Sequence, residues 1–379
     1  MPVTTALHEQ RPHKRTRILR LVLSIGETNA AYNQFSLPMA DRQDITICTY
    51  FKSGFKPADG ITLFAGDNTL RGFFRALSAA VAAKTYDIVH THSSHVGVFY
   101  IAATLLKSRK HTPPVVFTLH NSFSAYKARH KWLLVPVFLF SDKIVCCSQA
   151  SYESVPALYR WLACDRLCRV SNGVNLDRVD EVLRRESQDR QNDSFSVVTV
   201  GRLIEVKNPF TLLQALRESD DRDSRLTFIG EGHLRDSLSM KIRENGNHDR
   251  VNFVGLLPRE EVYRHLAKSD LFVSTSRVEG MPIAVLEAMA CRCPMVLSDI
   301  PSHREIAVGV DFIPLVDPDD IQGFAEQIQR FRQMSVKERT EIGGLCRELV
   351  EQKFSLRSMH EAYNAAYTEV LHKRQLLAL

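Results

Sequence analysis

Short apolar runs alternate along the chain with longer stretches whose apolar residues recur at helical spacing. In the first half these patterns predict strands at 18–24, 45–50, 87–90, 115–119 and 143–147, and helices at 70–83, 96–108 and 131–140. In the second half they predict strands at 197–200, 226–229, 251–254, 271–274 and 295–297, and helices at 209–217, 234–245, 259–268, 283–291 and 320–332. Strand–helix alternation with β-branched strands indicates parallel sheets covered on both faces. The fold class is therefore α/β, and the alternation occurs twice.

A polar, charged segment separates the two alternating halves. Residues 177–194 carry no apolar period, so we expect a linker there, between a first domain at 1–176 and a second at 195–355. After a charged helix at 336–353, residues 356–371 are again helical in pattern. This pattern permits the last segment, 356–379, to pack back on the first domain.

The composition is that of a globular protein. The 379 residues suffice for two domains with full cores, and 44% hydrophobic with 24% charged residues are ordinary values. The net charge of +6 suits an anionic substrate or an acidic membrane surface, and it gives no indication of nucleic acid as a partner.

Neither the N-terminus nor the cysteines indicate export. The basic N-terminus lacks the apolar core of a signal peptide, and we expect it to fray. No run approaches the roughly 20 apolar residues of a spanning helix. The eight cysteines form no Cys-x-x-Cys pair, which favours buried free thiols in a reducing compartment. We therefore expect a cytoplasmic protein.

The most informative segment follows the strand predicted at 271–274. It reads Ser-Arg-Val-Glu-Gly-Met-Pro-Ile-Ala-Val-Leu-Glu and places Glu279 and Glu287 eight residues apart. Pro282 suits the first position of the following helix, because its missing N–H costs nothing there. Free N–H groups at a helix start attract anions, and carboxylates beside them can accept hydrogen bonds from hydroxyl groups. Phosphate and sugar hydroxyls side by side describe a nucleotide-sugar.

Two cations follow the first strand of the second half. Arg202 lies directly after Gly201, and Lys207 lies further along the same strand-to-helix loop. Parallel sheets bind ligands outside the carboxyl ends of their strands. An arginine fork and a lysine charge at that edge can hold a diphosphate. The competing interpretation is that Arg202 and Lys207 are ordinary surface residues. We favour the diphosphate site because the acidic segment follows a strand of the same predicted sheet.

Glycine-containing turns follow the next two strands. Gly230 and Gly232 flank a glutamate after the strand at 226–229, and Gly255 precedes Leu257 after the strand at 251–254. Glycine lets a planar group approach the backbone closely, so either turn could form a wall for a nucleobase. A tight strand-to-helix turn is the competing explanation, and each turn taken alone favours it.

With these residues, the second half resembles the retaining glycosyltransferases of family 4. That family has the GT-B architecture, in which two Rossmann-like domains face each other across a cleft. The likeness spans residues 195–310 and rests on the segments Gly201-Arg202-Leu203 with Lys207, Gly230-Glu231-Gly232, Phe253-Val254-Gly255 and the paired glutamates. In the family, the nucleotide-sugar binds the second domain and the acceptor binds the first.

The resemblance implies a role for each of these residues. Arg202 and Lys207 would hold the diphosphate. Glu279 would contact hydroxyls of the donor sugar, and Glu287 would accept from the ribose hydroxyls. The remaining expected donor-site residues are Gly201, Gly230, Gly232, Leu257, Gly280, Met281, Pro282 and Ile283. The expected catalytic residues are His92, Arg202, Lys207 and Glu279.

The first half resembles the family more loosely. His92 follows the strand at 87–90 and His120 follows the strand at 115–119, where the family has histidines of the active cleft. Both are therefore expected to bind the acceptor, although a lone histidine beside apolar residues is otherwise a structural residue. Strand alternation sends His90 and His92 to one face, and only His92 is expected to reach the cleft.

Two positions depart from the family. Asn175 stands where an aspartate is usual, and both residues suit a turn. After its first strand the family often has a Gly-Gly pair over the phosphates, whereas this chain has Gly26 followed by Glu27. Gly26 stays in the expected donor site. A carboxylate would repel the diphosphate, so Glu27 is expected to face acceptor hydroxyls or solvent.

A basic edge with an aromatic residue precedes the apolar stretch that ends at Phe140. It comprises Lys127, Arg129, His130, Lys131 and Trp132. Such an edge could rest on an anionic membrane, at its inner face, since many relatives glycosylate lipid-linked acceptors. For residues 133–140 we favour a buried helix packed on the first sheet, and we leave the basic edge open.

The expected reaction transfers a hexosyl group from a nucleoside-diphosphate sugar to an acceptor hydroxyl with retention, in surface polysaccharide or glycolipid synthesis. No carboxylate nucleophile is evident besides Glu279, so a front-face reaction is expected. No cofactor and no metal are expected, because the resemblance to GT-B enzymes implies a reaction that needs no bound metal. A GT-B nucleotide-sugar epimerase, an inverting transferase and an inactive transferase-like scaffold are the alternatives.

Overall fold

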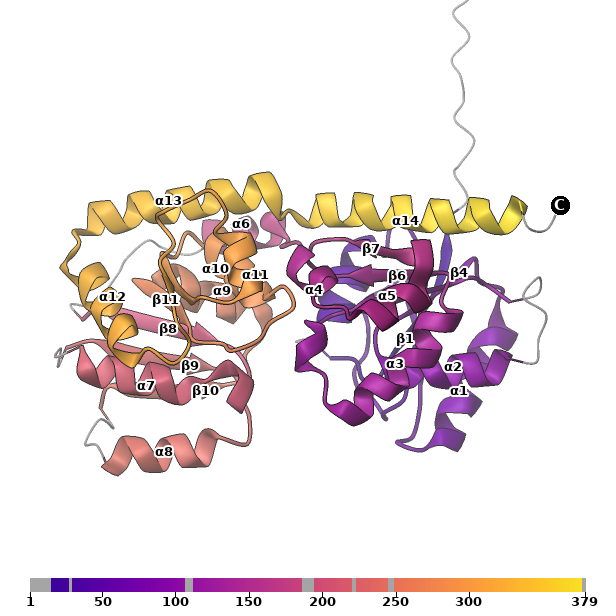
Figure 1. Ribbon diagram of the computed structural model, residues 1–379, viewed down its shortest axis with the longest axis horizontal. Coiled ribbons are helices and arrows are strands. Elements are labelled where there is room, and N and C mark those ends of the chain that lie inside the picture. Colours follow the sequence, from indigo (N-terminus) through magenta and orange to yellow (C-terminus); the bar gives the residue numbers. More distant parts are fainter. Residues whose placement is uncertain are drawn as a thin grey trace, which may run out of the picture.

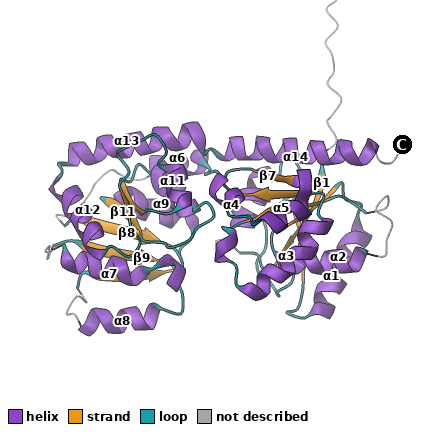
Figure 2. Ribbon diagram, in the orientation of Figure 1, coloured by secondary structure: helices purple, strands orange, loops and turns teal. Residues whose placement is uncertain are grey.

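The computed structural model describes residues 15–26, 29–105, 112–185, 194–219, 223–244 and 249–376. The basic N-terminal segment and Glu27 lie outside these ranges. Within them the chain forms two lobes, one around each of two sheets, and two long C-terminal helices lie along one side of both lobes (Figure 1). The strands lie inside each lobe and the helices outside (Figure 2).

The first lobe is built on a seven-stranded sheet in which every pair is parallel. Its strands are β1 Arg17–Val22, β2 Asp44–Thr49, β3 Ile61–Ala65, β4 Ile88–Thr91, β5 Val115–Leu119, β6 Lys143–Cys146 and β7 Leu167–Arg169. The order is β3-β2-β1-β4-β5-β6-β7. The five strands predicted for this half are confirmed, whereas the two edge strands, β3 and β7, were not predicted.

Helices cover both faces of this sheet. They are α1 Leu70–Ala83, α2 Ser94–Thr104, α3 Ala128–Phe140, α4 Gln149–Glu153 and α5 Ala157–Ala163, with the π-helix η1 Ala31–Ser36. Thr69 caps α1 by accepting from the N–H of Gly72, which satisfies one of the free donors at the helix start. Phe73 and Leu77 of α1 pack with Val96 of α2 in one buried cluster.

The second lobe repeats this plan. Its strands are β8 Ser196–Val200, β9 Arg225–Ile229, β10 Val251–Gly255, β11 Leu271–Ser274, β12 Met295–Ser298 and β13 Leu315–Val316, in the parallel order β10-β9-β8-β11-β12-β13. Its helices are α7 Pro209–Glu218, α8 Arg235–Glu244, α9 Arg259–Lys268, α10 Ile283–Ala290, α11 Pro301–Ile306, α12 Ile321–Gln333 and α13 Val336–Lys353. Both sheets reverse their strand order beside the first strand, which is where such sheets bind ligands. The α/β prediction with two parallel sheets is confirmed.

Two segments connect the lobes. The stretch expected to be a polar linker begins with a helix, α6 Leu176–Arg184, whose Val179 and Val182 are buried against the second lobe. Leu176 and Leu183 of the same helix pack on that core as well, so the apolar residues of α6 recur at helical spacing on one side. The last helix, α14 Leu356–Leu376, packs on the first lobe, where the Tyr367 hydroxyl lies 2.7 Å from Nδ1 of His90.

All eight cysteines are free, and of these Cys164 is exposed. In the part of the chain that the structure describes, no helix is both long and apolar enough to cross a bilayer.

Candidate functional site

The loops at the carboxyl ends of both sheets meet at the junction of the lobes. Gly280, beyond β11, lies so close to the first lobe that an added Cβ would be 2.3 Å from the carbonyl oxygen of His120, beyond β5. Ser148, beyond β6, donates to the carbonyl oxygen of Gly280 at 2.8 Å. Asn172 donates to that of Met281 at 3.0 Å. The segment predicted to bind the donor therefore lies against the segment predicted to bind the acceptor.

A carboxylate of the second lobe fixes this junction. The two oxygens of Glu305, on α11, accept the backbone N–H groups of Gln149 and Ala150 at 2.9 Å each. These N–H groups belong to the start of α4, where negative charge is favoured. The sequence offered no signal for Glu305, because its partners lie more than 150 residues earlier.

Lys207 and Glu279, both predicted site residues, form an ion pair. Lys207 donates to Oε1 of Glu279, and their side chains are 24% and 10% exposed. The Ser276 hydroxyl donates to the same oxygen at 2.8 Å. Burial raises the pKa of Glu279, but the charge and hydrogen bond of Lys207 outweigh it, so the pKa lies below its ordinary value. Glu279 is thus an ionised hydrogen-bond acceptor.

His303 lies buried near this pair and was not predicted. Its Nδ1 lies 2.8 Å from the carbonyl oxygen of Ser298. Burial lowers the pKa of His303 to about 4, although the charge of Glu279 opposes the shift. The ring is therefore neutral at physiological pH.

This burial predicts a pH-dependent stability. The unfolded state takes up the proton of His303 below its ordinary value of 6.5, whereas the folded state does so only near a pKa of about 4. The unfolded state binds more protons between these values, so the free energy of unfolding falls as pH drops through this window. Urea unfolding at neutral pH and at about pH 5 should show a smaller loss in His303→Asn than in the wild type. Equal losses would contradict the assignment.

Arg202 is exposed on the loop after β8 and lines the same small pocket as Lys207. The loop backbone is fixed, because the N–H of Gly201 donates to Ile229 at 2.9 Å and that of Leu203 to Glu231 at 3.0 Å. A guanidinium on a rigid loop at the carboxyl edge of a sheet suits a diphosphate.

Gly230 and Gly232 support this loop from behind. A Cβ on Gly230 would lie 2.0 Å from the carbonyl oxygen of Gly201, and one on Gly232 would lie 2.2 Å from that of Leu203. Gly230 also has a φ of +136°. Tight packing explains both glycines, and a contact with the nucleobase stays a prediction. Leu257 is half-buried and packs on the core of the second lobe.

Glu287, the second predicted glutamate, is not brought together with Glu279. It is fully buried on α10, 3.0 Å from a guanidinium nitrogen of Arg259 and 3.4 Å from the Tyr263 hydroxyl. Burial raises the pKa of Glu287 although Arg259 opposes the shift. A ribose would reach this carboxylate only if Arg259 moved. The helix α10 begins at Ile283, where the predicted range begins, and Pro282 is its N-cap instead of its first residue.

The histidines of the first lobe form a stack. The rings of His90 and His92 lie 4.0 Å apart, and Nδ1 of His92 lies 3.0 Å from Nε2 of His120. The expectation that His90 and His92 share a face is confirmed. Beneath them, buried Arg20 lies 3.0 Å from Nδ1 of His90.

Burial controls the protonation of this stack. It lowers the pKa of His92 well below its ordinary value, with His90, His120 and Arg20 adding to the shift, and it lowers that of His120 to about 4. Among the described residues, Nε2 of His92 is buried without a hydrogen-bond partner. A neutral ring with one unsatisfied nitrogen suits a hydroxyl ligand.

The loop after β1 and the capacity to hold a metal ion are two further features of the site. Gly26 lies on the loop after β1, and a Cβ there would meet nothing within 4 Å, so packing alone does not require glycine. Within the described ranges, no group of three or more histidines, cysteines and carboxylates could hold a metal ion.

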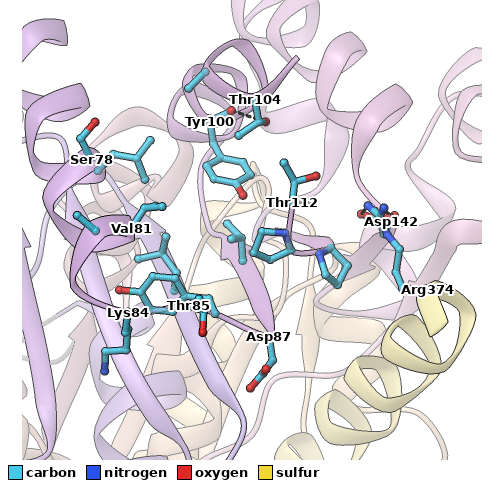
Figure 3. Close-up of a pocket in the computed structure, with 18 of the residues that line it drawn as sticks. Ser78, Val81, Lys84, Thr85, Asp87, Tyr100, Thr104, Thr112, Asp142 and Arg374 are labelled. Carbon is cyan, nitrogen blue, oxygen red and sulfur yellow. Dashed lines mark hydrogen bonds and ion pairs between the residues drawn. The ribbon is translucent and has the colours of Figure 1, made fainter. Parts of the chain in front are cut away.

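A large cavity lies elsewhere, in the first lobe. It has a volume of about 940 Å³ and is lined by α1, α2 and the amino ends of strands, including Tyr100, Asp87 and Val81 (Figure 3). The predicted donor and acceptor residues do not line it.

Family models match both halves of the chain. Residues 43–178 match Glycosyltransferase Family 4, and residues 181–344 match Glycosyl transferases group 1. The chain is 26% identical over 310 residues to UDP-Gal:alpha-D-GlcNAc-diphosphoundecaprenol alpha-1,3-galactosyltransferase of Escherichia coli, covering 77% of each protein. It is 26% identical to GDP-mannose:cellobiosyl-diphosphopolyprenol alpha-mannosyltransferase of Xanthomonas campestris, covering 67% of each.

Solved structures share the fold. HepE of Anabaena in complex with UDP and glucose superposes with a TM-score of 0.77 at 18% identity, covering 94% of this chain and 100% of that one. Sucrose-phosphate synthase from Thermosynechococcus elongatus superposes with a TM-score of 0.76 at 19% identity, covering 96% and 100%. The chain therefore belongs to the GT-B glycosyltransferases of the family 4 type, with a group 1 glycosyl transferase domain in its second half.

Proposed function

We propose that this enzyme transfers a hexosyl group, with retention of configuration, from a nucleoside-diphosphate sugar to a hydroxyl of a lipid-linked carbohydrate. One observation carries the proposal: Lys207, which pairs with Glu279, lines the same pocket as Arg202, and Glu279 is followed by Gly280, which contacts the first lobe. Arg202 and Lys207, which would hold the diphosphate, and Glu279, which would bind the sugar, then lie on the side of the second lobe that faces the acceptor lobe.

Catalysis depends mainly on stabilising the negative charge of the departing diphosphate. Arg202, Lys207 and the N–H groups at the start of α10 supply positive potential where negative charge grows in the transition state. Lys207 is held by Glu279 before the donor arrives, so little reorganisation is needed. Within the described chain, Ser276 and Lys207 both bond Oε1 of Glu279, which leaves Oε2 for a hydroxyl of the donor sugar.

Retention follows from a front-face reaction. A covalent intermediate needs a carboxylate nucleophile at the anomeric carbon, and Glu279 is already engaged by Lys207. In the proposed reaction a phosphate oxygen of the donor takes the proton of the acceptor hydroxyl. Trapping a glycosyl–enzyme adduct would overturn this step.

The first lobe receives the acceptor. Neutral His92, whose Nδ1 lies 3.0 Å from Nε2 of His120, would accept from an acceptor hydroxyl through its buried Nε2 once acceptor binding exposes that atom. The Escherichia coli and Xanthomonas campestris relatives are named for diphosphoundecaprenol and diphosphopolyprenol acceptors, which supports a lipid-linked acceptor here. The enzyme would then act without a bound metal, in the cytoplasm at the anionic inner face of a membrane, in surface polysaccharide or glycolipid synthesis.

A thermal-shift panel of uridine, guanosine and adenosine diphosphate sugars tests the donor class. The two relatives are named for a UDP-sugar and a GDP-sugar, so the panel must include both bases. A ligand at about 100 times its dissociation constant stabilises a protein by about 2.7 kcal/mol, so one base should give a clear shift. NMR of the anomeric proton of the product then tests retention. No stabilisation by any member would contradict the proposal.

A further inference from the structure

Both tryptophans of the chain are exposed, and they lie on neighbouring helices of the first lobe. The sequence contains two, Trp132 on α3 and Trp161 on α5. Their exposed fractions are 76% and 73%, although tryptophan is a residue that globular proteins largely bury. Three more large apolar side chains of the same helices are exposed: Leu139, Phe140 and Leu158.

The two helices pack against each other. Figure 1 shows α3 and α5 in the same part of the first lobe, and the Tyr159 hydroxyl donates to the carbonyl oxygen of Lys131 at 2.8 Å. Arg166 ties their far ends by donating to the carbonyl oxygen of Leu139 at 2.9 Å. The opposite side of α3 is fully buried through Leu134, Val137 and Phe138, so the helix is held by the core and the exposed side chains are not needed to hold it.

This surface is basic as well as apolar. Lys127 and Arg129, at the start of α3, are exposed beside Trp132, and Lys131 follows in the same turn. Neither α3 nor α5 contains an acidic residue. A basic surface with exposed tryptophan and aliphatic side chains has the chemistry of the interface between water and an anionic bilayer.

We propose that α3 and α5 are the docking face for an anionic lipid bilayer. Charge complementarity favours this occupant over a second copy of the chain, because two identical basic surfaces would repel each other. Isolated exposed apolar residues are common, but a group of this size on adjoining helices is typical of an interaction site.

The docking face begins near a loop of the second lobe. The hydrogen bond from His233 lowers the pKa of Glu205 on that loop, and the charge of Lys127, from the first lobe, adds a smaller contribution in the same direction. Glu205 opens the short helix η6 Glu205–Lys207, which ends at the lysine of the site. A bilayer under α3 would therefore present a lipid-linked acceptor next to the cleft. The delivery of a lipid-linked acceptor rests on the proposed function, whereas the binding of the bilayer to α3 and α5 does not.

Intrinsic fluorescence tests the inference, because all tryptophan emission comes from this face. The full chain is mixed with vesicles of phosphatidylcholine alone or of phosphatidylcholine with phosphatidylglycerol. The anionic vesicles should shift the emission to the blue, brominated acyl chains should quench it, and salt should weaken both effects. Unchanged emission with the anionic vesicles would overturn the inference.

Variants separate this face from the rest of the surface. In vesicle co-sedimentation, Trp132→Ser with Trp161→Ser should bind at least about tenfold more weakly, while Met240→Ser, exposed on α8, should bind as the wild type. Arg129→Gln should bind about fivefold more weakly, and Lys337→Gln, exposed on α13, should not. Wild-type binding by the double variant would overturn the inference.

Two controls distinguish the other outcomes. If ultracentrifugation shows a dimer that the double tryptophan variant abolishes, the face binds a second copy and the bilayer inference is wrong. Donor-induced thermal stabilisation of the double variant should equal that of the wild type, because neither tryptophan lies in the donor site. Normal stabilisation without vesicle binding would refute only the docking face, whereas vesicle binding without stabilisation would refute only the proposed function.

Discussion

Arg202→Ala is expected to lower turnover about 10²–10³-fold at saturating donor, because it removes a preorganised group that stabilises the departing diphosphate. Arg202 is exposed, so its loss should leave the free energy of unfolding nearly unchanged. Arg217→Ala, on the helix that follows this loop, is the matched control and should retain wild-type turnover.

Lys207→Ala is expected to lower turnover by a similar factor, and it is also expected to lower the stability of the protein. Its removal leaves the Glu279 carboxylate, 10% exposed, without its cation. Burial then raises the pKa of Glu279 without opposition from Lys207, and the stability should fall as well. If both variants keep near-normal turnover at saturating donor, the assignment of the diphosphate site is wrong.

Gly280→Ala is expected to lower turnover about 10²-fold, because displacing reacting groups by about 1 Å can have that effect. The new Cβ would lie 2.3 Å from the carbonyl oxygen of His120 and 2.9 Å from the Cα of Asn121. Both are backbone atoms, so the clash can be relieved only by moving the loop or separating the lobes. Steady-state kinetics would show the loss mainly in kcat.

Gly344→Ala is the matched control for this substitution. Gly344 lies within α13, and a Cβ there would meet nothing within 4 Å. Alanine is also the better helix former, so stability should be equal or higher and turnover unchanged. Wild-type kcat in Gly280→Ala would contradict the close contact between the two lobes.

The sequence predicted the central strands of the first sheet and missed both of its edge strands for a physical reason. β2, β4 and β5 are buried along nearly their whole length and read as apolar runs. β3 lies at one edge of its sheet with mostly partly exposed residues, and β7 at the other edge has three residues. An edge strand carries a weak pattern because one side of it meets no neighbour.

The site was predictable where the loops after two neighbouring strands carry the chemistry. The positions of Lys207 and Glu279 after their strands indicated that they would meet at one edge of a sheet, and they form an ion pair. Partners that come from elsewhere in the fold left no local signal. Arg259 covers Glu287, and Glu305 holds the start of α4 across the junction. Such contacts depend on how the helices and lobes pack, which no local pattern encodes.

The measurement that tests the central claim most directly is a crystal structure with the nucleoside-diphosphate sugar that gives the largest thermal shift. The diphosphate should lie between the Arg202 guanidinium and the Lys207 ammonium, with a sugar hydroxyl on the Glu279 carboxylate. A diphosphate bound away from these groups, for example in the cavity between α1 and α2, would contradict the account.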